Sequence, residues 1–232
     1  MGYDFIIDQK EGFSNPSPDM AYEEMCQHFM IQLLHTSFAK NLAEFINIIS
    51  PSSVINSLTQ VILRYTVPGV PDLYQGREEW DFSLVGPDNR RPVNYSKLQE
   101  NLEQEVNLLE LTASWHDGRI KQPIIYTLFK LRKNYPQIFT NGQYKELLVQ
   151  GPLSDHVVAF QRSTKDIKII VITTRFNFSL EVDEFLRSYH CGWNGTKIYL
   201  HDRQRDVDWK SILWGNTFRN KDILEPFWKF VI

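Results

Sequence analysis

The spacing of apolar residues changes near residue 140, and this change most constrains what the chain can fold into. Before Asn141-Gly142, apolar side chains recur every three or four residues, as on one face of an α-helix. After it they alternate in short runs such as HVVAFQR and IKIIVITT, separated by the turn sequence STKD, which is typical of β-strands. The pattern predicts an α+β chain, with residues 1–140 helical and residues 141–232 forming a small antiparallel β-sandwich-like domain.

The helical part predicts several separate helices. The first begins at Asp19, kinks around residues 35–37 and ends at Pro51, because proline cannot continue the hydrogen-bond ladder. A second helix then extends to about Tyr65, with a serine of ISPSS as its cap. Two more are expected: one over residues 95–112 and one over RIKQPIIYTLFKLRKNYPQIF. Ser96 would cap the former, and the latter has a proline near its end.

Composition limits the classes of function. The hydrophobic share of 42% and charged share of 23% are those of a globular protein. The net charge of −3 without a basic stripe argues against a nucleic-acid partner. Cys26 and Cys191 form no metal-binding spacing and are expected as free thiols. We find no secretory signal and expect no apolar stretch long enough to span a bilayer, so the chain is predicted to be cytoplasmic.

A long charged segment, TVPGVPDLYQGREEWDFSLVGPDNRRPVNY, runs from Thr66 to Tyr95. It combines a PGVP turn, aromatic residues and a crowd of carboxylates and arginines. Long polar loops with a sharp entry are commonly binding or catalytic loops. The alternative is an ordinary exposed connection between two helices.

The same segment carries a resemblance to a known superfamily. Gly69, Pro71, Gly76 and Glu78 match the G-x-P-x-x-x-x-G-x-E pattern of the eighth strand of α-amylase-superfamily (β/α)8 barrels, which implies a short strand at VPDLYQG. The continuation WDFSLVGPDNRRPVNY resembles the W-D-x-x-L-V-D-P-D-N-R-R-P-V-D-Y run of the maltooligosyltrehalose synthase family. The similarity covers roughly residues 20–162.

Three positions depart from the family pattern. Gly86 and Asn94 stand where the family usually has Asp, and Glu79 replaces an apolar residue. These departures affect the expected details of sugar recognition.

The resemblance implies an activity that the chain alone is not expected to perform. The family converts the terminal α-1,4 link of a maltooligosaccharide to an α,α-1,1 link, without a cofactor or metal. This retaining chemistry needs two carboxyl groups about 5 Å apart, and these belong to earlier strands of a barrel of roughly 250 residues. VPDLYQG begins at Val70, and no H-D-T-K-R-S-E-D-like run is found. The sequence therefore resembles the C-terminal third of such an enzyme, without its catalytic residues.

The resemblance also implies that the charged loop lies at the rim of a sugar site. Tyr74 and Trp80 could stack on glucose rings, or could be core residues. The loop arginines could bind sugar hydroxyls, or could pair with Asp88 as a scaffold, and Lys121 could reach a sugar or solvate a helix start. The predicted substrate-binding residues are Tyr74, Gln75, Glu78, Trp80, Asp88, Asn89, Arg90, Arg91 and Lys121.

Three roles are compatible with the sequence. The chain could be part of a split or degenerate maltooligosyltrehalose synthase, which needs an N-terminal barrel fragment or self-association to cover its strand edge. It could be a non-catalytic maltooligosaccharide-binding module. It could also be a folded gene remnant with a new role. Catalysis by the local acids is not expected, because it requires two carboxylates held in a cleft.

Overall fold

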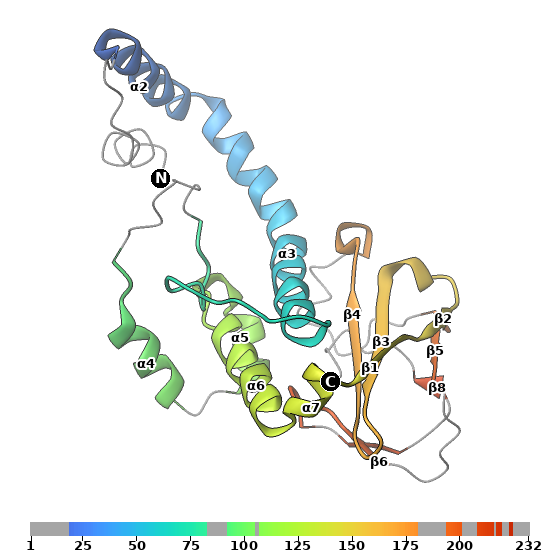
Figure 1. The fold of residues 1–232 in the computed structure, drawn as a ribbon. Helices are drawn as coiled ribbons and strands as arrows, with labels where there is room; N and C mark the ends of the chain where they lie inside the picture. The colour runs from blue at the N-terminus through green and yellow to red at the C-terminus, as the bar shows by residue number, and fades with distance from the viewer. Residues whose placement is uncertain are drawn as a thin grey trace. The chain divides into compact units, whose positions relative to one another are not determined.

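The computed structural model describes residues 19–82, 92–104, 107–180, 194–200, 208–215, 217–219 and 223–224. The chain divides into two compact units (Figure 1). One unit comprises Met1–Ser50 and Asp81–Asn94, and the other comprises Pro51–Trp80 and Tyr95–Ile232. The predicted residues Asp88, Asn89, Arg90 and Arg91 and the thiol of Cys191 lie outside the described residues.

The first unit contains helix α2 (Met20–Leu34) and the beginning of helix α3 (Ser37–Thr66). Asp19 caps α2, because its carboxylate accepts the backbone N–H of Tyr22 at 3.1 Å. The chain breaks at His35 and Thr36, and the Thr36 hydroxyl accepts the N–H of Phe38 at 3.2 Å. The predicted start of the helix and its kink are both confirmed.

The predicted helix end at Pro51 is wrong, since α3 continues through this residue to Thr66. Proline removes one donor from the ladder, and the preceding Ser50 hydroxyl donates to the Ile46 carbonyl at 2.6 Å. From Pro51 onward the helix has a buried face that includes Val54 and Leu58. Burial of this apolar face outweighs the loss of one helical hydrogen bond.

The second unit holds the remaining helices. A single helix was predicted over residues 95–112, but the structure has two, and Ser96 lies inside the first of them. Pro136 begins a short helix, in keeping with its fixed φ at a first helical position. The elements are α4 (Tyr95–Glu103), α5 (Leu108–Ala113), the 3-10 turn η1 (Trp115–Asp117), α6 (Lys121–Asn134) and α7 (Pro136–Thr140).

The strands that follow form three small antiparallel sheets, which confirms the predicted change of period. One sheet has the order β1-β3-β4, the second β2-β5-β8 and the third β6-β7. Register in the first sheet runs from Val157 opposite Thr174 to Ser163 opposite Lys168. The strands are β1 (Gln143–Glu146), β2 (Leu148–Gln150), β3 (Val157–Ser163), β4 (Lys168–Thr174), β5 (Lys197–Tyr199), β6 (Asp208–Lys210), β7 (Thr217–Arg219) and β8 (Ile223–Leu224).

The strand predicted at VPDLYQG is wrong. Residues 70–74 have no regular structure, and residues 75–78 form a turn. A strand exists only as part of a hydrogen-bonded ladder, and none of the described strand pairs includes this segment. The mixed helical and antiparallel composition is confirmed, while the assignment to a barrel end and a sandwich stays a prediction.

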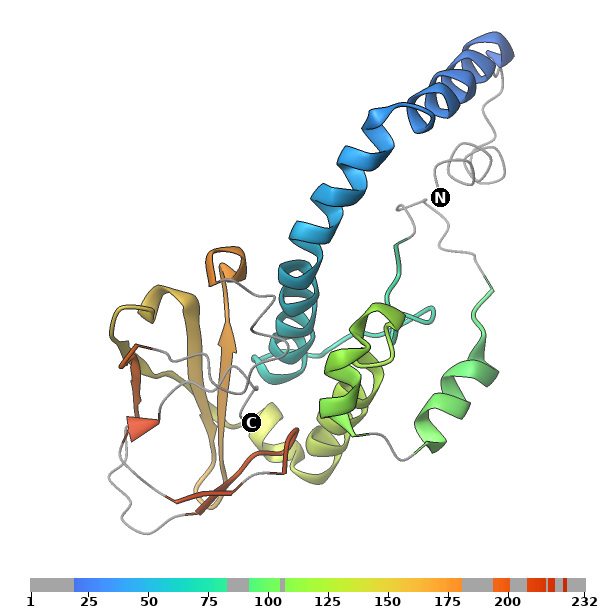
Figure 2. The same cartoon turned by 180° about the vertical axis from the view of Figure 1, so that it is seen from behind.

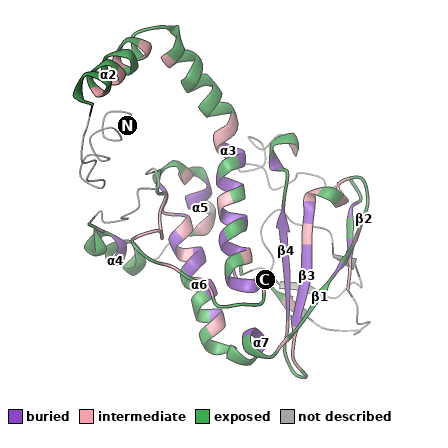
Figure 3. Cartoon of the chain, turned by 45° about the horizontal axis from the view of Figure 1, so that its top comes forward, coloured by how far each residue is buried: buried purple, intermediate pink, exposed green. Residues whose placement is uncertain are grey.

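Helices and strands of the second unit share a core. The C-terminal half of α3 lies between α6 and the β3–β4 strands in both views (Figures 1 and 2). Alternate residues of β3 and β4 belong to two different clusters of buried apolar residues. Phe160 and Val171 belong to the larger cluster, which contains residues of α3 and α6, whereas Ala159 and Ile170 belong to the smaller one. Figure 3 shows burial concentrated on these elements. The period of two in the sequence thus corresponds to a sheet covered on both faces.

Arg162 on β3 is a buried cation at the centre of this packing, with only 2% of its surface exposed. Its guanidinium donates to carbonyl oxygens of Thr66 at 3.1 Å, Ile138 at 2.8 Å, and Phe139 and Gly142 at 3.3 Å each. Burial lowers its pKa from the ordinary value of an arginine. The side chain thereby satisfies carbonyls at the ends of α3 and α7.

We expect Arg162→Met to lower the free energy of unfolding by about 3 kcal/mol, because several buried carbonyls lose their donor. Urea denaturation followed by circular dichroism measures the change. Lys145→Met is the matched control, since Lys145 is an exposed cation on the neighbouring strand β1. Equal unfolding midpoints for the two variants would contradict the central role of Arg162.

The sequence led us to expect no apolar stretch long enough to span a bilayer, but helix α3 is such a stretch. Over its 30 residues it is long and apolar enough to cross a membrane, and 44% of its most apolar window is buried inside the protein. A single helix of this kind is weak support for a membrane span, because core helices share the same length and composition. Its C-terminal half is such a core helix.

Candidate functional site

The described part of the charged loop leaves α3 through a sharp turn. Gly69 and Gly76 have φ values of +132° and +73°, which favour glycine. Gln75 also has a positive φ of 54°, and the Arg77 N–H donates to the Tyr74 carbonyl at 3.4 Å. Both glycines of the motif therefore occupy positions that require their conformational freedom. Tyr74 is 48% exposed at this turn.

Two arginines hold the start of the loop. Arg132 on α6 donates to the carbonyl oxygens of Tyr65 at 2.9 Å and Gly69 at 3.1 Å. Arg64 donates to the carbonyl of Asp72 at 3.4 Å. Because these bonds satisfy backbone groups near the C-terminal end of α3, they also set the direction in which the loop leaves the helix.

Trp80 holds the end of the described loop against the core. Its indole N–H donates to the Trp115 carbonyl at 2.6 Å, and the ring is partly buried against the larger cluster. Gly118 has φ +82°, and a Cβ there would lie 2.9 Å from the Trp80 backbone nitrogen. The amino group of Lys121 lies 5.8 Å from the centre of the Trp80 ring. These are contacts of a packed side chain, and sugar stacking by Trp80 stays a prediction.

Glu79 joins the loop to helix α4. Its carboxylate accepts hydrogen bonds from Lys97 Nζ and Asn101 Nδ2, both at 2.7 Å. Lys121 Nζ donates to the Glu79 carbonyl oxygen at 3.2 Å. The Glu79 side chain is 16% exposed, whereas Lys97 is 51% exposed. In the sequence Glu79 stands out only as a departure from the family pattern. Lys97 and Asn101 lie four residues apart on α4, a spacing that places two polar groups on the same side of a helix.

Glu78 and Tyr65 both carry buried oxygen atoms without a hydrogen-bond partner, Glu78 Oε2 and the Tyr65 hydroxyl. Burial is the main cause that raises the pKa of Tyr65, and the charges of Glu78 and Asp72 raise it further, while Arg64 opposes them. The negative charge of Glu78 therefore acts on the Tyr65 hydroxyl. Unsatisfied buried polar atoms are uncommon and mark places where a ligand or water can bind.

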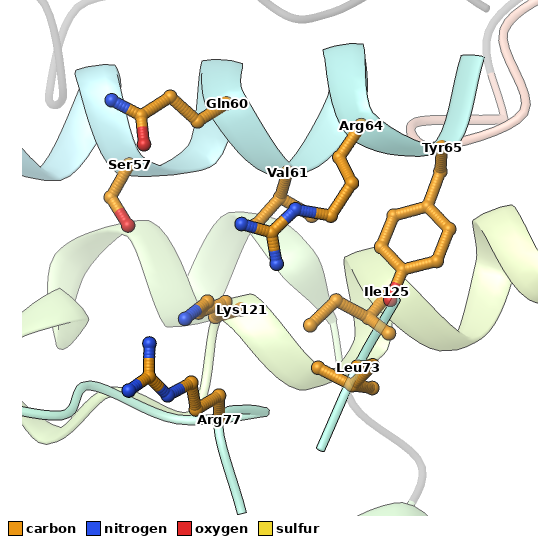
Figure 4. Close-up of a pocket in the computed structure, with 9 residues that line it drawn as sticks. All are labelled: Ser57, Gln60, Val61, Arg64, Tyr65, Leu73, Arg77, Lys121 and Ile125. Carbon is orange, nitrogen blue, oxygen red and sulfur yellow. The ribbon is translucent and has the colours of Figure 1, made fainter. Parts of the chain in front are cut away.

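A hollow lies between α3, α6 and the turn at residues 73–77 (Figure 4). Its cavity volume is about 60 Å³, far below the several hundred cubic ångströms of a typical pocket for a small molecule. A glucose chain would therefore need further walls. The lining residues are Ser57, Gln60, Val61, Arg64, Tyr65, Leu73, Arg77, Lys121 and Ile125.

The structure brings some of the predicted site residues together. Trp80 and Lys121 are in contact, and Lys121 also lines the hollow. Tyr74 and Gln75 lie on the exposed turn, where the Arg77 guanidinium is 5.4 Å from the Tyr74 ring centre. Within the described ranges, no three His, Cys, Asp or Glu side chains group to hold a metal ion. Sequence reasoning missed Ser57, Gln60, Arg64, Tyr65 and Arg77, because they converge only where α3, α6 and the loop pack together.

Two solved structures share the arrangement of helices and sheets described above. One is a point mutant of maltooligosyltrehalose synthase from Arthrobacter ramosus. The match covers 90% of this chain and 25% of the length of that enzyme, with 25% sequence identity and a TM-score of 0.67. A crystal structure of maltooligosyl trehalose synthase matches 92% of this chain and 26% of its own, with 28% identity and a TM-score of 0.66. The chain therefore has the fold of one part of an α-amylase-like enzyme.

Curated relatives show which enzyme the sequence of this chain is similar to. A protein from each of two Mycobacterium tuberculosis strains, named maltooligosyl trehalose synthase, is 32% identical over 201 residues. The match covers 87% of this chain, which spans about a quarter (23%) of the length of these relatives. No protein-family model matches the chain. The chain is a homologue of one part of maltooligosyltrehalose synthase.

We expect Gly118→Ala to lower the free energy of unfolding by about 3 kcal/mol, because a side chain at positive φ is strained and its Cβ would meet the Trp80 backbone. Tryptophan fluorescence during urea unfolding measures both stability and the Trp80 environment. Gly215→Ala is the control: Gly215 has φ +72° and open space around the added Cβ, so only about 1 kcal/mol is expected. Equal losses would show that Trp80 does not depend on Gly118.

The ion pair between Asp117 and Arg119 predicts that the stability of the fold depends on pH. Burial raises the pKa of Asp117, but hydrogen bonds from Arg119 Nε at 2.9 Å and its N–H at 3.0 Å, with the arginine charge, lower it below 3.8 overall. A carboxyl group with a lowered folded pKa stabilises the fold above its ordinary pKa, and this contribution is lost as the pH falls through the folded pKa. We expect Asp117→Asn to flatten the acid limb of stability below about pH 4.

Thermal unfolding measured from pH 7 to pH 2 tests this expectation. Asp155→Asn serves as the control, because Asp155 is an exposed carboxylate of the same kind in another 3-10 turn, η2 (Ser154–His156). A similar flattening in both variants would contradict a specific role of Asp117. The effect is small, since both side chains of the pair are about two-fifths exposed.

Proposed function

We propose that this chain forms the C-terminal part of a maltooligosyltrehalose synthase, in which the terminal α-1,4 link of a maltooligosaccharide becomes an α,α-1,1 link. The observation that carries the proposal is similarity in sequence and fold over most of this chain to about a quarter of that enzyme. Residues 1–140 would contribute the end of the catalytic barrel, and residues 141–232 the β-domain beside it. The enzyme would belong to the isomerases and act in the cytoplasm.

The chain would contribute substrate-binding residues and a supporting wall, not the reacting carboxylates. A retaining mechanism needs two carboxyl groups about 5 Å apart, one as nucleophile and one as acid. In the described loop, Glu79 is bound by Lys97 and Asn101, which suits a scaffold. Glu78 keeps one buried oxygen without a partner, and we expect this oxygen to accept a hydrogen bond from a sugar hydroxyl.

The exposed ring of Tyr74 offers a stacking platform for a glucose unit, because the C–H faces of sugars are apolar. Gln75 lies beside it on the same exposed turn. Lys121 and Trp80 would line the base of the site. Asp88, Asn89, Arg90 and Arg91 complete the proposed binding set through the family's D-N-R-R motif.

The apolar side chains exposed in the first unit support a further proposal, that this unit binds a partner over a large surface. Helix α2 has no buried residue, and Figure 3 shows exposed residues along α2 and the first half of α3. Large apolar areas left exposed are typical of interaction sites. We propose that they pack on the barrel segment that carries the carboxylates, or on a second copy. The exposed residues are Met20, Tyr22, Met25, Phe29, Met30, Leu34, Phe38, Leu42, Phe45, Ile46 and Ile48.

A chimera tests the proposed function. This chain replaces the matching segment of a Mycobacterium tuberculosis relative, and the purified protein is incubated with maltopentaose. We expect the folded chimera to release a trehalose-ended product, whereas the relative without the segment yields none. A chimera that folds, as shown by a cooperative thermal transition, but forms no product would contradict the proposal.

We expect Tyr74→Ala in this chimera to weaken maltopentaose binding about tenfold, since stacking on an exposed ring is lost. Isothermal titration measures the affinity. Tyr126→Ala is the matched control, because Tyr126 is 45% exposed on α6 and is not one of the proposed substrate-binding residues. Titration of the chain alone separates the alternative: binding without the rest of the enzyme would identify a non-catalytic maltooligosaccharide-binding module.

A further inference from the structure

The hollow between α3 and α6 gathers three basic side chains. Arg64, Arg77 and Lys121 line it, and no lining residue carries a negative charge. Figure 4 shows both guanidinium groups and the Lys121 amino group directed toward the same space. Like charges that converge in this way repel one another, so a neighbouring anion would stabilise the arrangement.

Tyr65 supplies a second and independent sign of a ligand. Its side chain lines the hollow, is 1% exposed and has a hydroxyl without a hydrogen-bond partner. A buried donor without a partner is costly, and an acceptor in the hollow would remove that cost. Ser57 and Gln60 add neutral donors on the α3 side.

Arg64 keeps donors available for such an acceptor. Among the described residues, its one hydrogen bond is the 3.4 Å contact to the Asp72 carbonyl, while a guanidinium group offers five N–H donors in a planar fork. A planar fork matches the oxygen pairs of phosphate and carboxylate groups. Lys121, which donates to the Glu79 carbonyl, adds positive charge from the opposite wall.

Size and charge together limit the occupant. The cavity volume of about 60 Å³ corresponds to about four water molecules, at roughly 15 Å³ each, and so to one tetrahedral oxyanion. Two carboxylates, Glu78 and Asp72, and two cations, Arg64 and Arg132, act electrostatically on Tyr65. The charged residues that line the hollow itself, Arg64, Arg77 and Lys121, are all basic.

We propose that this hollow is a binding site for a tetrahedral oxyanion, either inorganic phosphate or the phosphate group of a phosphorylated sugar, held by Arg64, Arg77, Lys121 and the Tyr65 hydroxyl. Oxyanion binding here is separate from the conversion of a glucan and does not require the rest of the enzyme. Val61, Leu73 and Ile125 also line the hollow, and apolar neighbours strengthen charged contacts by lowering the local dielectric constant.

Titration of the complete chain tests the site, with inorganic phosphate, glucose 6-phosphate, glucose and sodium chloride at matched ionic strength. Isothermal titration and thermal unfolding are both recorded. We expect phosphate to bind with a dissociation constant of about 1 mM. At a phosphate concentration tenfold above this constant, the unfolding midpoint should rise by a few degrees. Glucose and chloride are expected to have no such effect. At least tenfold tighter binding of glucose 6-phosphate would identify the sugar phosphate as the source.

Variants assign the effect to the hollow. Arg64→Gln and Arg77→Gln should each weaken phosphate binding about tenfold, and Tyr65→Phe about fivefold without loss of stability, because phenylalanine fills the same space. Lys130→Gln, an exposed cation on the same helix as Lys121, is the control and should bind normally. The site is disproved if chloride reproduces the phosphate effect, or if Tyr65→Phe and Arg64→Gln bind phosphate like the unaltered chain.

Discussion

The buried guanidinium of Arg162 is the interaction on which the second unit depends. It comes from the middle sheet strand and donates to carbonyl groups of α3, α7 and the turn that enters β1. A buried charge is tolerated only where its hydrogen bonds are well satisfied. The strands, α7 and the end of α3 must therefore be arranged around this one side chain. Since the charged loop begins where α3 ends, Arg162 also determines where the candidate site starts.

The loop itself is fixed by contacts that involve no catalytic chemistry. Arg132 holds its entry through two carbonyl groups, and Glu79 holds its end through Lys97 and Asn101. Trp80 fits against Gly118, where no larger residue is accommodated. Side chains held in this way can position a substrate without reacting with it. This arrangement agrees with a chain that provides one wall of a larger enzyme.

One departure from the family pattern, Glu79, gains a physical explanation from these contacts. Glu79 replaces an apolar residue, yet its carboxylate binds a lysine and an asparagine of α4. The added charge therefore ties the loop to a helix. The hollow next to this loop has an excess of basic groups and an unpartnered Tyr65 hydroxyl, features that a neutral glucan does not require.

Local patterns determined much of the fold. The change of period at Asn141-Gly142, the start of the first helix at Asp19 and the kink around residues 35–37 were all predicted, because each depends on neighbouring residues in the chain. The similarity to maltooligosyltrehalose synthase was also present in the loop motif and is confirmed by its relatives. Sequence reasoning failed at Pro51, since the free energy gained by burying the C-terminal half of α3 is a property of tertiary packing.

The remaining differences have the same physical origin. VPDLYQG is a strand only where a partner strand offers hydrogen bonds, and the described structure pairs it with none. The bond between Glu79 and α4 spans 18 residues, and those of Arg162 span up to 96. The hollow joins side chains of α3, the loop and α6. The sequence by itself determined the change from helices to strands and the similarity to maltooligosyltrehalose synthase. Tertiary packing alone decided which distant polar groups meet, because burial and hydrogen-bond partners exist only once the chain has folded.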